Sequence, residues 1–143
     1  MYSKQTIEIL IQRYETLTQE NIDFLLELYA SDASFKDPFN NVIGRDAIKH
    51  IFVHMFQKIE FPRFRVIDWV LEDNKSCLRW EFHTHNPDNP SPNIIYGCTW
   101  LSLNKDGLIQ EHRDYWDAAE ELYEKLPILG SLMKWLKKRI SAN

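Results

Sequence analysis

The sequence has little cysteine and little glycine, and it has no long hydrophobic run. Its two cysteines, Cys77 and Cys98, stand in apolar stretches without a CxxC motif or the Cys/His spacing of a zinc site, so we expect buried free thiols. The four glycines form no phosphate-binding loop, and no GxSxG or dinucleotide-binding pattern occurs. No apolar stretch approaches the roughly 18 residues that cross a bilayer. Disulfide scaffolds, nucleotide-binding enzymes and membrane-spanning proteins are therefore disfavoured.

An excess of positive charge is also absent. The 17 lysines and arginines are outnumbered by 21 aspartates and glutamates, which gives a net charge of −4. Such a chain has no general attraction to phosphate backbones, so we expect no nucleic-acid partner. The opening stretch MYSKQTIEIL begins an amphipathic pattern and lacks the apolar segment of a secretion signal. Together with the free thiols, this leads us to expect a cytoplasmic protein.

Apolar residues are plentiful, at 44% of 143 residues, which is enough for a single domain (1–143) with its own core. Their spacing predicts helices over residues 7–17, 22–29 and 45–58, and short strands at 33–38 and 40–44. A period of two then predicts strands at 64–72, 76–85, 94–104 and 108–117, with residues 118–143 as a C-terminal helical extension. This order indicates an α+β domain in which a curved antiparallel sheet covers helices on one face.

Two motifs carry a resemblance to a known superfamily: LYASDASFKDPFNNVIGRDAI, residues 28–48, and RDYWD, residues 113–117. With this order of elements, nearly the whole chain resembles the nuclear transport factor 2-like superfamily, which includes SnoaL-like and ketosteroid isomerase-like domains. The resemblance implies a conical, cystatin-like roll whose sheet wraps around the N-terminal helices. This fold carries isomerases, cyclases, epoxide hydrolases and non-catalytic transport factors, so it does not by itself define a reaction.

Two catalytic sets of the superfamily match in part. The resemblance to ketosteroid isomerases implies Tyr14 as a hydrogen-bond donor and Asp37 as the general base, but Thr99 stands where those enzymes place a protonated aspartate. The resemblance to limonene-epoxide-hydrolase-like members implies Asp114 as the inward aspartate of an Asp-Arg-Asp triad. Gly97 and Thr99 stand where its other two members would be. Neither set is complete in this sequence.

Alternation gives each strand an inner and an outer face. We place His112, Asp114 and Trp116 inside the cone, because a conical pocket needs polar groups on an otherwise aromatic wall. The predicted ligand contacts are then Phe52, Met55, Trp80, Phe82, Thr99, Leu101 and Trp116. We expect the opposite face of the sheet to support a homodimer, with Arg79, Glu81, His83, Tyr96 and Trp100 on it.

The candidates for catalysis are Asp37, Asp114, His112 and Tyr14. Asp37 stands between Phe35 and Phe39, so we expect its carboxyl group to face an apolar cavity, where loss of hydration favours the neutral acid and makes a useful base. The alternative is that Asp37 closes a turn next to Pro38. Both interpretations fit the sequence.

The other candidates also have structural alternatives. Tyr14 is otherwise a core residue whose hydroxyl needs a partner, His112 a satisfied histidine, and Asp114 a buried carboxylate held by an arginine or tyrosine. His50 and His54 stand four apart on the third helix without the glutamate of an HExxH motif or a third ligand, which indicates a solvated face. We therefore predict no metal and no cofactor.

The C-terminal extension reads as an amphipathic, basic helix. Its apolar residues recur at helical spacing, and Lys134, Lys137, Lys138 and Arg139 lie mainly on other faces. We favour packing of its apolar face against the sheet or over the mouth of the cone, with a hinge at Pro127 and Gly130. The alternative is weak contact with a membrane surface or a lipid-like ligand.

Polar groups on an aromatic wall favour the binding of a small, mostly apolar molecule. The first hypothesis adds cofactor-free acid/base catalysis of the isomerase, cyclase, dehydratase or hydrolase type. The alternative is a non-catalytic module that binds a lipid or polyketide-like ligand, or that interacts with another protein.

Overall fold

The computed structural model describes residues 4–84, 88, 94–117 and 127–141. Its helices are α1 (Lys4–Glu15), α2 (Ile22–Leu26), α3 (Arg45–Lys58) and α5 (Pro127–Ile140), with the 3-10 helix η1 (Gln19–Asn21) before α2. Its strands are β1 (Tyr29–Lys36), β2 (Asn41–Ile43), β3 (Arg63–Glu72), β4 (Lys75–His83), β5 (Ile94–Leu103) and β6 (Ile109–Trp116). These elements confirm the predicted α+β class.

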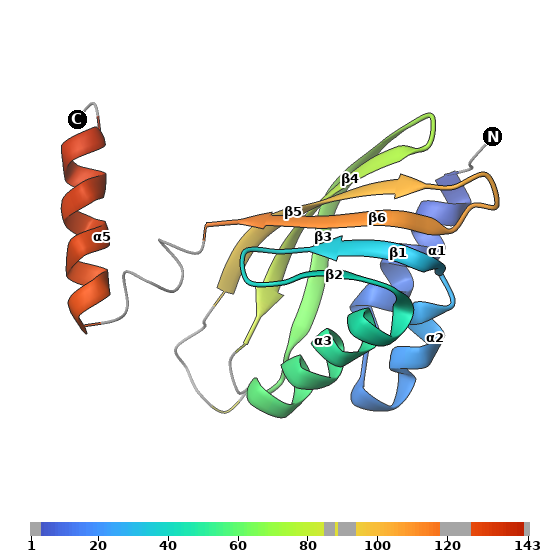
Figure 1. Ribbon diagram of the computed structural model, residues 1–143, viewed down its shortest axis with the longest axis horizontal. Helices are drawn as coiled ribbons and strands as arrows, with labels where there is room; N and C mark the ends of the chain where they lie inside the picture. The colour runs from blue at the N-terminus through green and yellow to red at the C-terminus, as the bar shows by residue number, and fades with distance from the viewer. Residues whose placement is uncertain (1–3, 85–87, 89–93, 118–126, 142–143) are drawn as a thin grey trace.

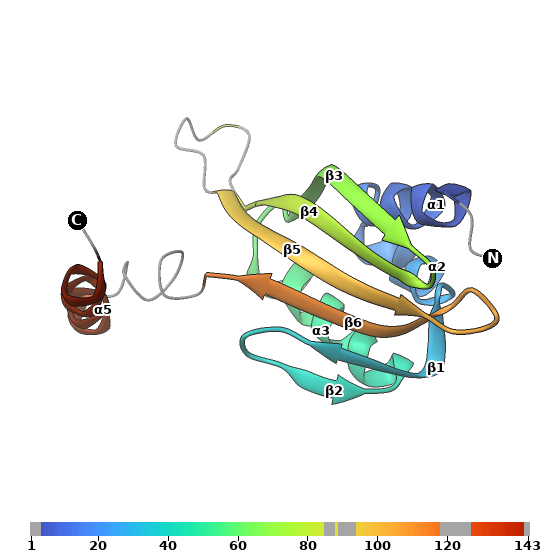
Figure 2. The same ribbon diagram turned by 90° about the horizontal axis from the view of Figure 1, so that it is seen from above.

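The strands form one six-stranded curved sheet in the order β2-β1-β6-β5-β4-β3 (Figure 1). Neighbouring strands are antiparallel, except that β1 pairs with β6 in parallel. The helices α1, α2 and α3 lie on one side of this sheet, as the second view also shows (Figure 2). The space between the sheet and these helices, which we call the cone, holds the core and the candidate site.

Strand alternation follows the predicted pattern. Along β4, Leu78, Trp80 and Phe82 are buried while Arg79 between them is exposed. Gly97 on β5 lies where a side chain would collide with the Trp80 ring, because a Cβ there would come within 2.5 Å of that ring. The indole can therefore lie flat against the neighbouring strand only because residue 97 has no side chain.

The second helix ends earlier than predicted. Residue 29 was expected to close it, but Tyr29 instead begins β1 and pairs with Ile109 of β6. Two contacts hold the chain there: Ile109 donates its backbone N–H to the Leu28 carbonyl at 2.8 Å, and the Arg45 guanidinium donates through Nε to the Tyr29 carbonyl at 2.7 Å. These tertiary contacts override the helical spacing of the preceding residues.

The thiols of Cys77 and Cys98 are free, as predicted, but they are half-buried rather than fully buried. Cys77 lies on β4 beside the exposed Arg79, on the face of the sheet away from the cone. Partial burial, and then the neighbouring Cys98, raise the pKa of the Cys77 thiol. Both cysteines remain thiols in the structure.

The helix α5 stands apart from the sheet and from the other helices in both views (Figures 1 and 2). It begins at Pro127, a position that suits proline because the first helical N–H has no partner. Large apolar side chains are open to solvent, with Leu132 49%, Trp135 53% and Ile140 81% exposed. The expectation that this face packs against the sheet or closes the cone is therefore wrong. The preceding part of the predicted extension, residues 118–126, lies outside the described residues.

Among the helices that the structure describes, none combines the length and the apolar character needed to cross a membrane.

Candidate functional site

Two adjoining cavities lie inside the cone. The inner cavity, of about 30 Å³, reaches from Tyr14 on α1 to Thr99 and His112 on the sheet. The outer cavity, of about 530 Å³, lies between α3, the β1–β2 turn and the sheet. Four residues line both cavities: Phe52, Phe64, Trp80 and Asp114. Of these four only Asp114 is charged, so its carboxylate lies at the boundary between a water-sized space and a ligand-sized one.

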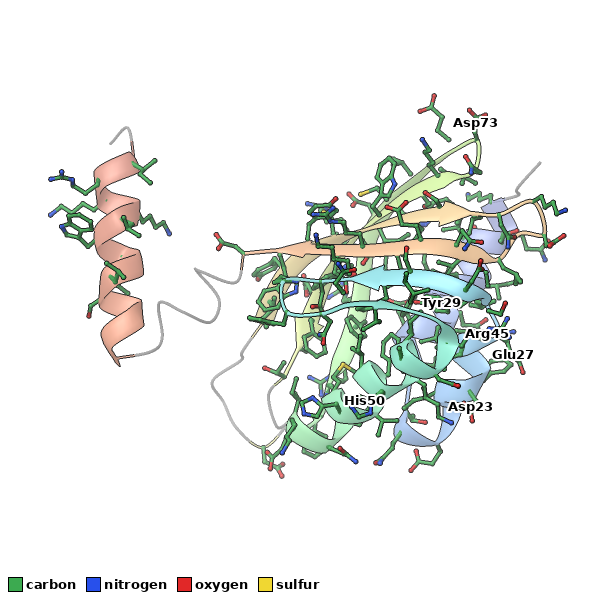
Figure 3. All side chains as sticks on the ribbon, in the orientation of Figure 1. Asp23, Glu27, Tyr29, Arg45, His50 and Asp73 are labelled. Carbon is green, nitrogen blue, oxygen red and sulfur yellow. The ribbon has the colours of Figure 1, made fainter. Side chains whose placement is uncertain are left out.

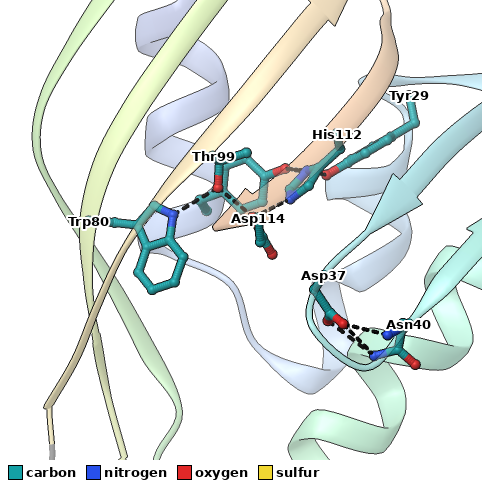
Figure 4. A network of polar contacts seen from close by, with 8 residues as sticks. Tyr29, Asp37, Asn40, Trp80, Thr99, His112 and Asp114 are labelled. Carbon is teal, nitrogen blue, oxygen red and sulfur yellow. Dashed lines mark hydrogen bonds and ion pairs between the residues drawn. The ribbon is translucent and has the colours of Figure 1, made fainter. Parts of the chain in front are cut away.

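A chain of hydrogen bonds holds one oxygen of Asp114 (Figure 4). Trp80 Nε1–H donates to Thr99 Oγ1 at 2.8 Å, and the Thr99 hydroxyl donates to Asp114 Oδ1 at 2.5 Å. The same oxygen lies 2.7 Å from His112 Nε2. Because β4, β5 and β6 are neighbours, and the even-numbered residues of β4 and β6 share the inner face with the odd-numbered residues of β5, the sheet register alone brings these four side chains together.

Two tyrosines hold the other side of His112. Its Nδ1 lies 3.0 Å from the Tyr14 hydroxyl and 2.8 Å from the Tyr29 hydroxyl, and the two hydroxyls bond to each other. The imidazole also stacks on Phe35, with ring centroids 4.4 Å apart, and only 3% of the residue is exposed. The ring is therefore fixed on both edges and on one face.

The network has a complete proton assignment with a neutral imidazole. His112 Nε2 then carries the proton and donates to Asp114, while Nδ1 accepts from one tyrosine. The second tyrosine donates to the first, and no buried hydroxyl proton lacks an acceptor. A charged imidazole would use Nδ1 as a donor and leave the last tyrosine proton without an acceptor among the described residues. The arrangement therefore favours a neutral His112.

Both tyrosines act as donors rather than bases. Burial, and next the neighbouring Tyr29, raise the pKa of Tyr14 well above its ordinary value. Burial likewise raises the pKa of Tyr29, although its hydrogen bond with Tyr14 acts in the opposite direction. Each phenol therefore keeps its proton at physiological pH.

The second oxygen of Asp114 is available to a ligand. Only Oδ1 is engaged by the described residues, and Figure 4 shows the other oxygen turned away from the network. The side chain is 18% exposed and lines the outer cavity. Two donors fix the orientation of the carboxylate, and its free oxygen faces the space that can hold a small molecule.

Asp37 also lines the outer cavity, but its contacts are those of the turn-closing alternative. Its Oδ1 accepts backbone N–H bonds from Phe39 at 2.8 Å and from Asn40 at 2.6 Å, and the Asn40 side-chain amide lies 3.1 Å from both carboxylate oxygens. The turn that follows Pro38 leaves these amides without strand partners, and the carboxylate supplies them. The expectation of a carboxyl group in a purely apolar setting is therefore wrong for Asp37, which is surrounded by the polar groups of its own turn.

The predicted ligand contacts divide into two groups. Phe52, Met55, Trp80, Phe82 and Trp116 line the outer cavity, and Thr99 lines the inner one. Leu101 lines neither cavity and is fully buried, so it belongs to the core instead. The inward phase of His112, Asp114 and Trp116 was correctly predicted.

Tyr29 and Phe64 are the residues that sequence reasoning missed. The helical spacing of residues 22–29 predicts that Tyr29 closes a helix, which would not place its side chain on the sheet beside the site. Ala33 and Phe35 on the same strand are both buried, but their alternation does not extend back to Tyr29, because Ser31 is exposed and the register with β6 shifts between Tyr29 and Ser34. Phe64 stacks on Phe82 with ring centroids 4.6 Å apart and forms part of the aromatic wall.

His50 and His54 lie at the mouth of the outer cavity. Both are exposed, as predicted, and their rings stack with centroids 6.5 Å apart. No group of three or more His, Cys, Asp or Glu side chains in the described part of the chain could hold a metal ion. The charged residues among the described lining of the outer cavity are Asp37 and Asp114, and neither lysine nor arginine joins them.

The comparisons with known proteins agree with this architecture. Residues 11–112 match the family described as SnoaL-like domain. No curated protein matches the chain significantly.

Several solved structures share the fold. A protein with a ketosteroid isomerase-like fold from Catenulispora acidiphila DSM 44928, in complex with trimethylamine, superimposes with a TM-score of 0.69 at 16% identity, covering 85% of this chain and 92% of that one. A protein with a cystatin-like fold from Methylobium petroleophilum PM1 gives 0.66 at 16% identity, covering 80% and 77%. An NTF2-like protein from Exiguobacterium sp. 255-15 gives 0.66 at 20% identity, covering 78% and 98%. The predicted cystatin-like, NTF2-like roll is confirmed.

Proposed function

Because the chain belongs to the SnoaL-like domain family, we propose that its cone binds a small, mostly apolar molecule and that Asp114 acts on it as an acid/base group without a cofactor. The observation that carries the proposal is the free Asp114 oxygen, which faces an aromatic cavity of about 530 Å³ while its partner oxygen is held by Thr99 and His112. A cavity of this volume is within the range of small-molecule sites.

In the proposed mechanism Asp114 Oδ2 takes a proton from the bound molecule and returns it at another atom. The His112 Nε2–H and the Thr99 hydroxyl hold Oδ1, so the carboxylate is oriented before the substrate arrives. The imidazole is itself held by the two phenols, which keeps it aligned with the Asp114 carboxylate while the proton is transferred. A positioned base of this kind contributes about 10²–10⁴-fold to a rate. Isomerisation, cyclisation and dehydration all need such a proton transfer.

The roles expected for Tyr14 and Asp37 change in this proposal. The Tyr14 hydroxyl is engaged with Tyr29 and His112, so we assign it to positioning the imidazole rather than to donating to a substrate oxygen. Asp37 stabilises the turn at the mouth of the cavity through its bonds to Asn40 and Phe39. A hydrolase of the epoxide-opening type is the least supported member of the group, because Gly97 and Thr99 stand where its other triad residues would be.

The charge of the cavity restricts the ligand. Two carboxylates and no described lysine or arginine line it, so a fatty acid or a phosphate ester is disfavoured, and a neutral or cationic molecule is favoured. Aromatic side chains such as Trp116 and Phe39, which meet edge to face at 5.6 Å, suit ring systems and organic ammonium groups. The relative from Catenulispora acidiphila is itself a complex with such an amine.

The test separates binding from chemistry. Thermal-shift screening of uncharged steroids, aromatic polyketides, terpene epoxides and amines, with fatty acids as the contrasting class, should yield stabilising hits outside the fatty acids. Each hit is then incubated with the protein in D₂O and followed by mass spectrometry for deuterium uptake or a change of mass. The variant D114N should keep the hit bound and lose at least about 100-fold in turnover, whereas D106N, at an exposed turn, should keep both.

Full turnover by D114N would refute the acid/base role of Asp114, but the proposal that the cone binds a small molecule would still stand. Failure of every neutral or cationic class to bind would remove the binding proposal itself.

A non-catalytic ligand carrier is the second candidate. The observation that favours it is that every polar atom of Tyr14, Tyr29 and His112 is already satisfied within the network, which leaves a single free carboxylate oxygen for chemistry. Native mass spectrometry of the purified protein distinguishes the two, because a carrier retains its ligand unchanged over time and an enzyme releases a product of altered mass or deuterium content.

We also propose that the chain forms a homodimer through the face of the sheet away from the cone. The large apolar or aromatic residues exposed on the strands support this: Ile67, Val70, Tyr96, Trp100 and Tyr115. Light scattering should give twice the chain mass, and Y96E should reduce it; a monomer at high concentration would contradict the proposal. The free thiols support a cytoplasmic location as part of the same proposal.

A further inference from the structure

The helix α5 differs in charge from the helices that pack on the sheet. α1 carries two basic and two acidic residues and α3 three basic and one acidic, whereas α5 carries four basic residues and no acidic one. The chain as a whole has a net charge of −4, so the residues outside α5, with 13 basic against 21 acidic side chains, carry −8. Positive charge is therefore concentrated on one helix of an otherwise acidic protein.

Among the residues that the structure describes, none outside α5 covers the apolar side of this helix. Leu132, Leu136 and Ile140 recur every four residues and so share one face, with Trp135 beside them, and all four are exposed. Side chains surround this helix without a neighbouring element next to them (Figure 3). By contrast, α1 buries Ile7, Leu10 and Tyr14.

The charged and apolar residues are arranged as on helices that lie in a membrane interface. At 100° per residue, Lys134, Lys137 and Lys138 fall on the side opposite to Leu132 and Leu136. Arg139 falls near the apolar side, where its guanidinium lies 5.2 Å from the Trp135 ring centroid. Tryptophan and arginine together suit the headgroup level, where an aromatic body meets apolar chains and a cation meets phosphates.

We propose that α5 binds the surface of an anionic lipid bilayer, with its apolar side in the headgroup and acyl boundary and its lysines toward the lipid phosphates. The absence of any acidic residue from α5 favours this occupant over a second protein surface, since helices that pack on this protein's own sheet mix both signs. The inference is independent of the chemistry proposed for the cone.

The test uses the full chain and co-sedimentation with large vesicles. Binding is expected to vesicles that contain phosphatidylserine, to be weak on pure phosphatidylcholine, and to fall at about 1 M salt, where the Debye length is about 3 Å. The variant K134Q/K137Q/K138Q should partition on the order of 100-fold less, since each basic residue near an anionic leaflet contributes about fivefold. The matched control K36Q/K58Q/K105Q removes the same charge from exposed lysines outside α5 and should bind like the unmodified chain.

A second variant tests the apolar side. L132S/W135S/I140S should lose vesicle binding while thermal unfolding of the sheet domain stays unchanged, because these side chains are exposed and do not belong to the core formed by the described residues. Absence of binding to phosphatidylserine vesicles would overturn the proposal, as would equal loss in the lysine variant and its control. Conversion of a dimer to a monomer by the apolar variant, without vesicle binding by the parent chain, would show that a second copy covers α5 and would also overturn it.

Discussion

Replacing Thr99 by valine removes the centre of the hydrogen-bond chain that orients Asp114. The Thr99 hydroxyl accepts from Trp80 Nε1 at 2.8 Å and donates to Asp114 Oδ1 at 2.5 Å, and the residue is 4% exposed. Valine has almost the same shape but neither donates nor accepts. The substitution therefore breaks two hydrogen bonds while creating almost no cavity.

The expected loss of stability follows from these two contacts. A hydrogen bond to a charged group contributes about 1.5–3 kcal/mol, and a buried donor left without an acceptor costs about 1–3 kcal/mol. Trp80 is only 6% exposed, so its N–H has little access to bulk water as a substitute. Because Asp114 keeps its bond to His112, we expect the free energy of unfolding to fall by about 2–5 kcal/mol and Tm by on the order of 10 °C.

Urea denaturation followed by circular dichroism measures the difference. The control T16V removes a hydroxyl at an exposed helix end and should change the free energy of unfolding by no more than about 0.5 kcal/mol. The variant T99S keeps a hydroxyl and should recover most of the loss. If T99V is as stable as T16V, the hydroxyl contributes nothing and the reasoning that Thr99 positions the carboxylate is refuted.

Two further predictions concern the same region. G97A should destabilise the fold by about 1–3 kcal/mol and displace the Trp80 ring, because the new methyl would come within 2.5 Å of it and 2.9 Å of the Tyr115 carbonyl; unchanged tryptophan fluorescence and an unchanged Tm would contradict this. The pKa values of Tyr14 and Tyr29 are raised in the folded state, so above about pH 10 the unfolded chain loses these protons while the folded protein keeps them. The free energy of unfolding should therefore be unaffected by these two groups below about pH 10 and should fall above it, by about 1.4 kcal/mol per pH unit for each tyrosine. Y29F should roughly halve this slope in denaturation curves taken above pH 10, and identical slopes for the two proteins would exclude the burial argument.

The spacing of apolar residues along the sequence was enough to predict the α+β roll, and their alternation along each strand was enough to predict the inner face of the sheet. The alternation in β4, β5 and β6 placed Trp80, Thr99, His112 and Asp114 in the cone, because one strand phase determines every side chain along it. The aromatic wall followed from the same phase. These are local rules that a single strand already obeys.

The errors arose where distant contacts or polar turn geometry decide the outcome. Tyr29 lies in a strand instead of the predicted helix because it pairs with β6, far along the chain. The Asp37 carboxylate accepts from the amides of residues 39 and 40 because the turn brings them within hydrogen-bonding distance of it. The spacing of α5 shows that its face is apolar, but spacing does not show what that face contacts. In each case the local preference of the residues was known, and the missing information was which other part of the protein they contact.

The parallel pairing of β1 with β6 has a consequence for the order of assembly. Tyr29 and Ile109 are separated by most of the chain, and contacts this distant in sequence are slow to close because the intervening loop must first lose its freedom. During synthesis Tyr14 and Tyr29 leave the ribosome long before His112, so the two phenols cannot yet form their hydrogen bonds with the imidazole. The network is complete only when the last strand inserts beside the first, and pulse-labelled hydrogen exchange would detect that closing step as the slowest gain of protection.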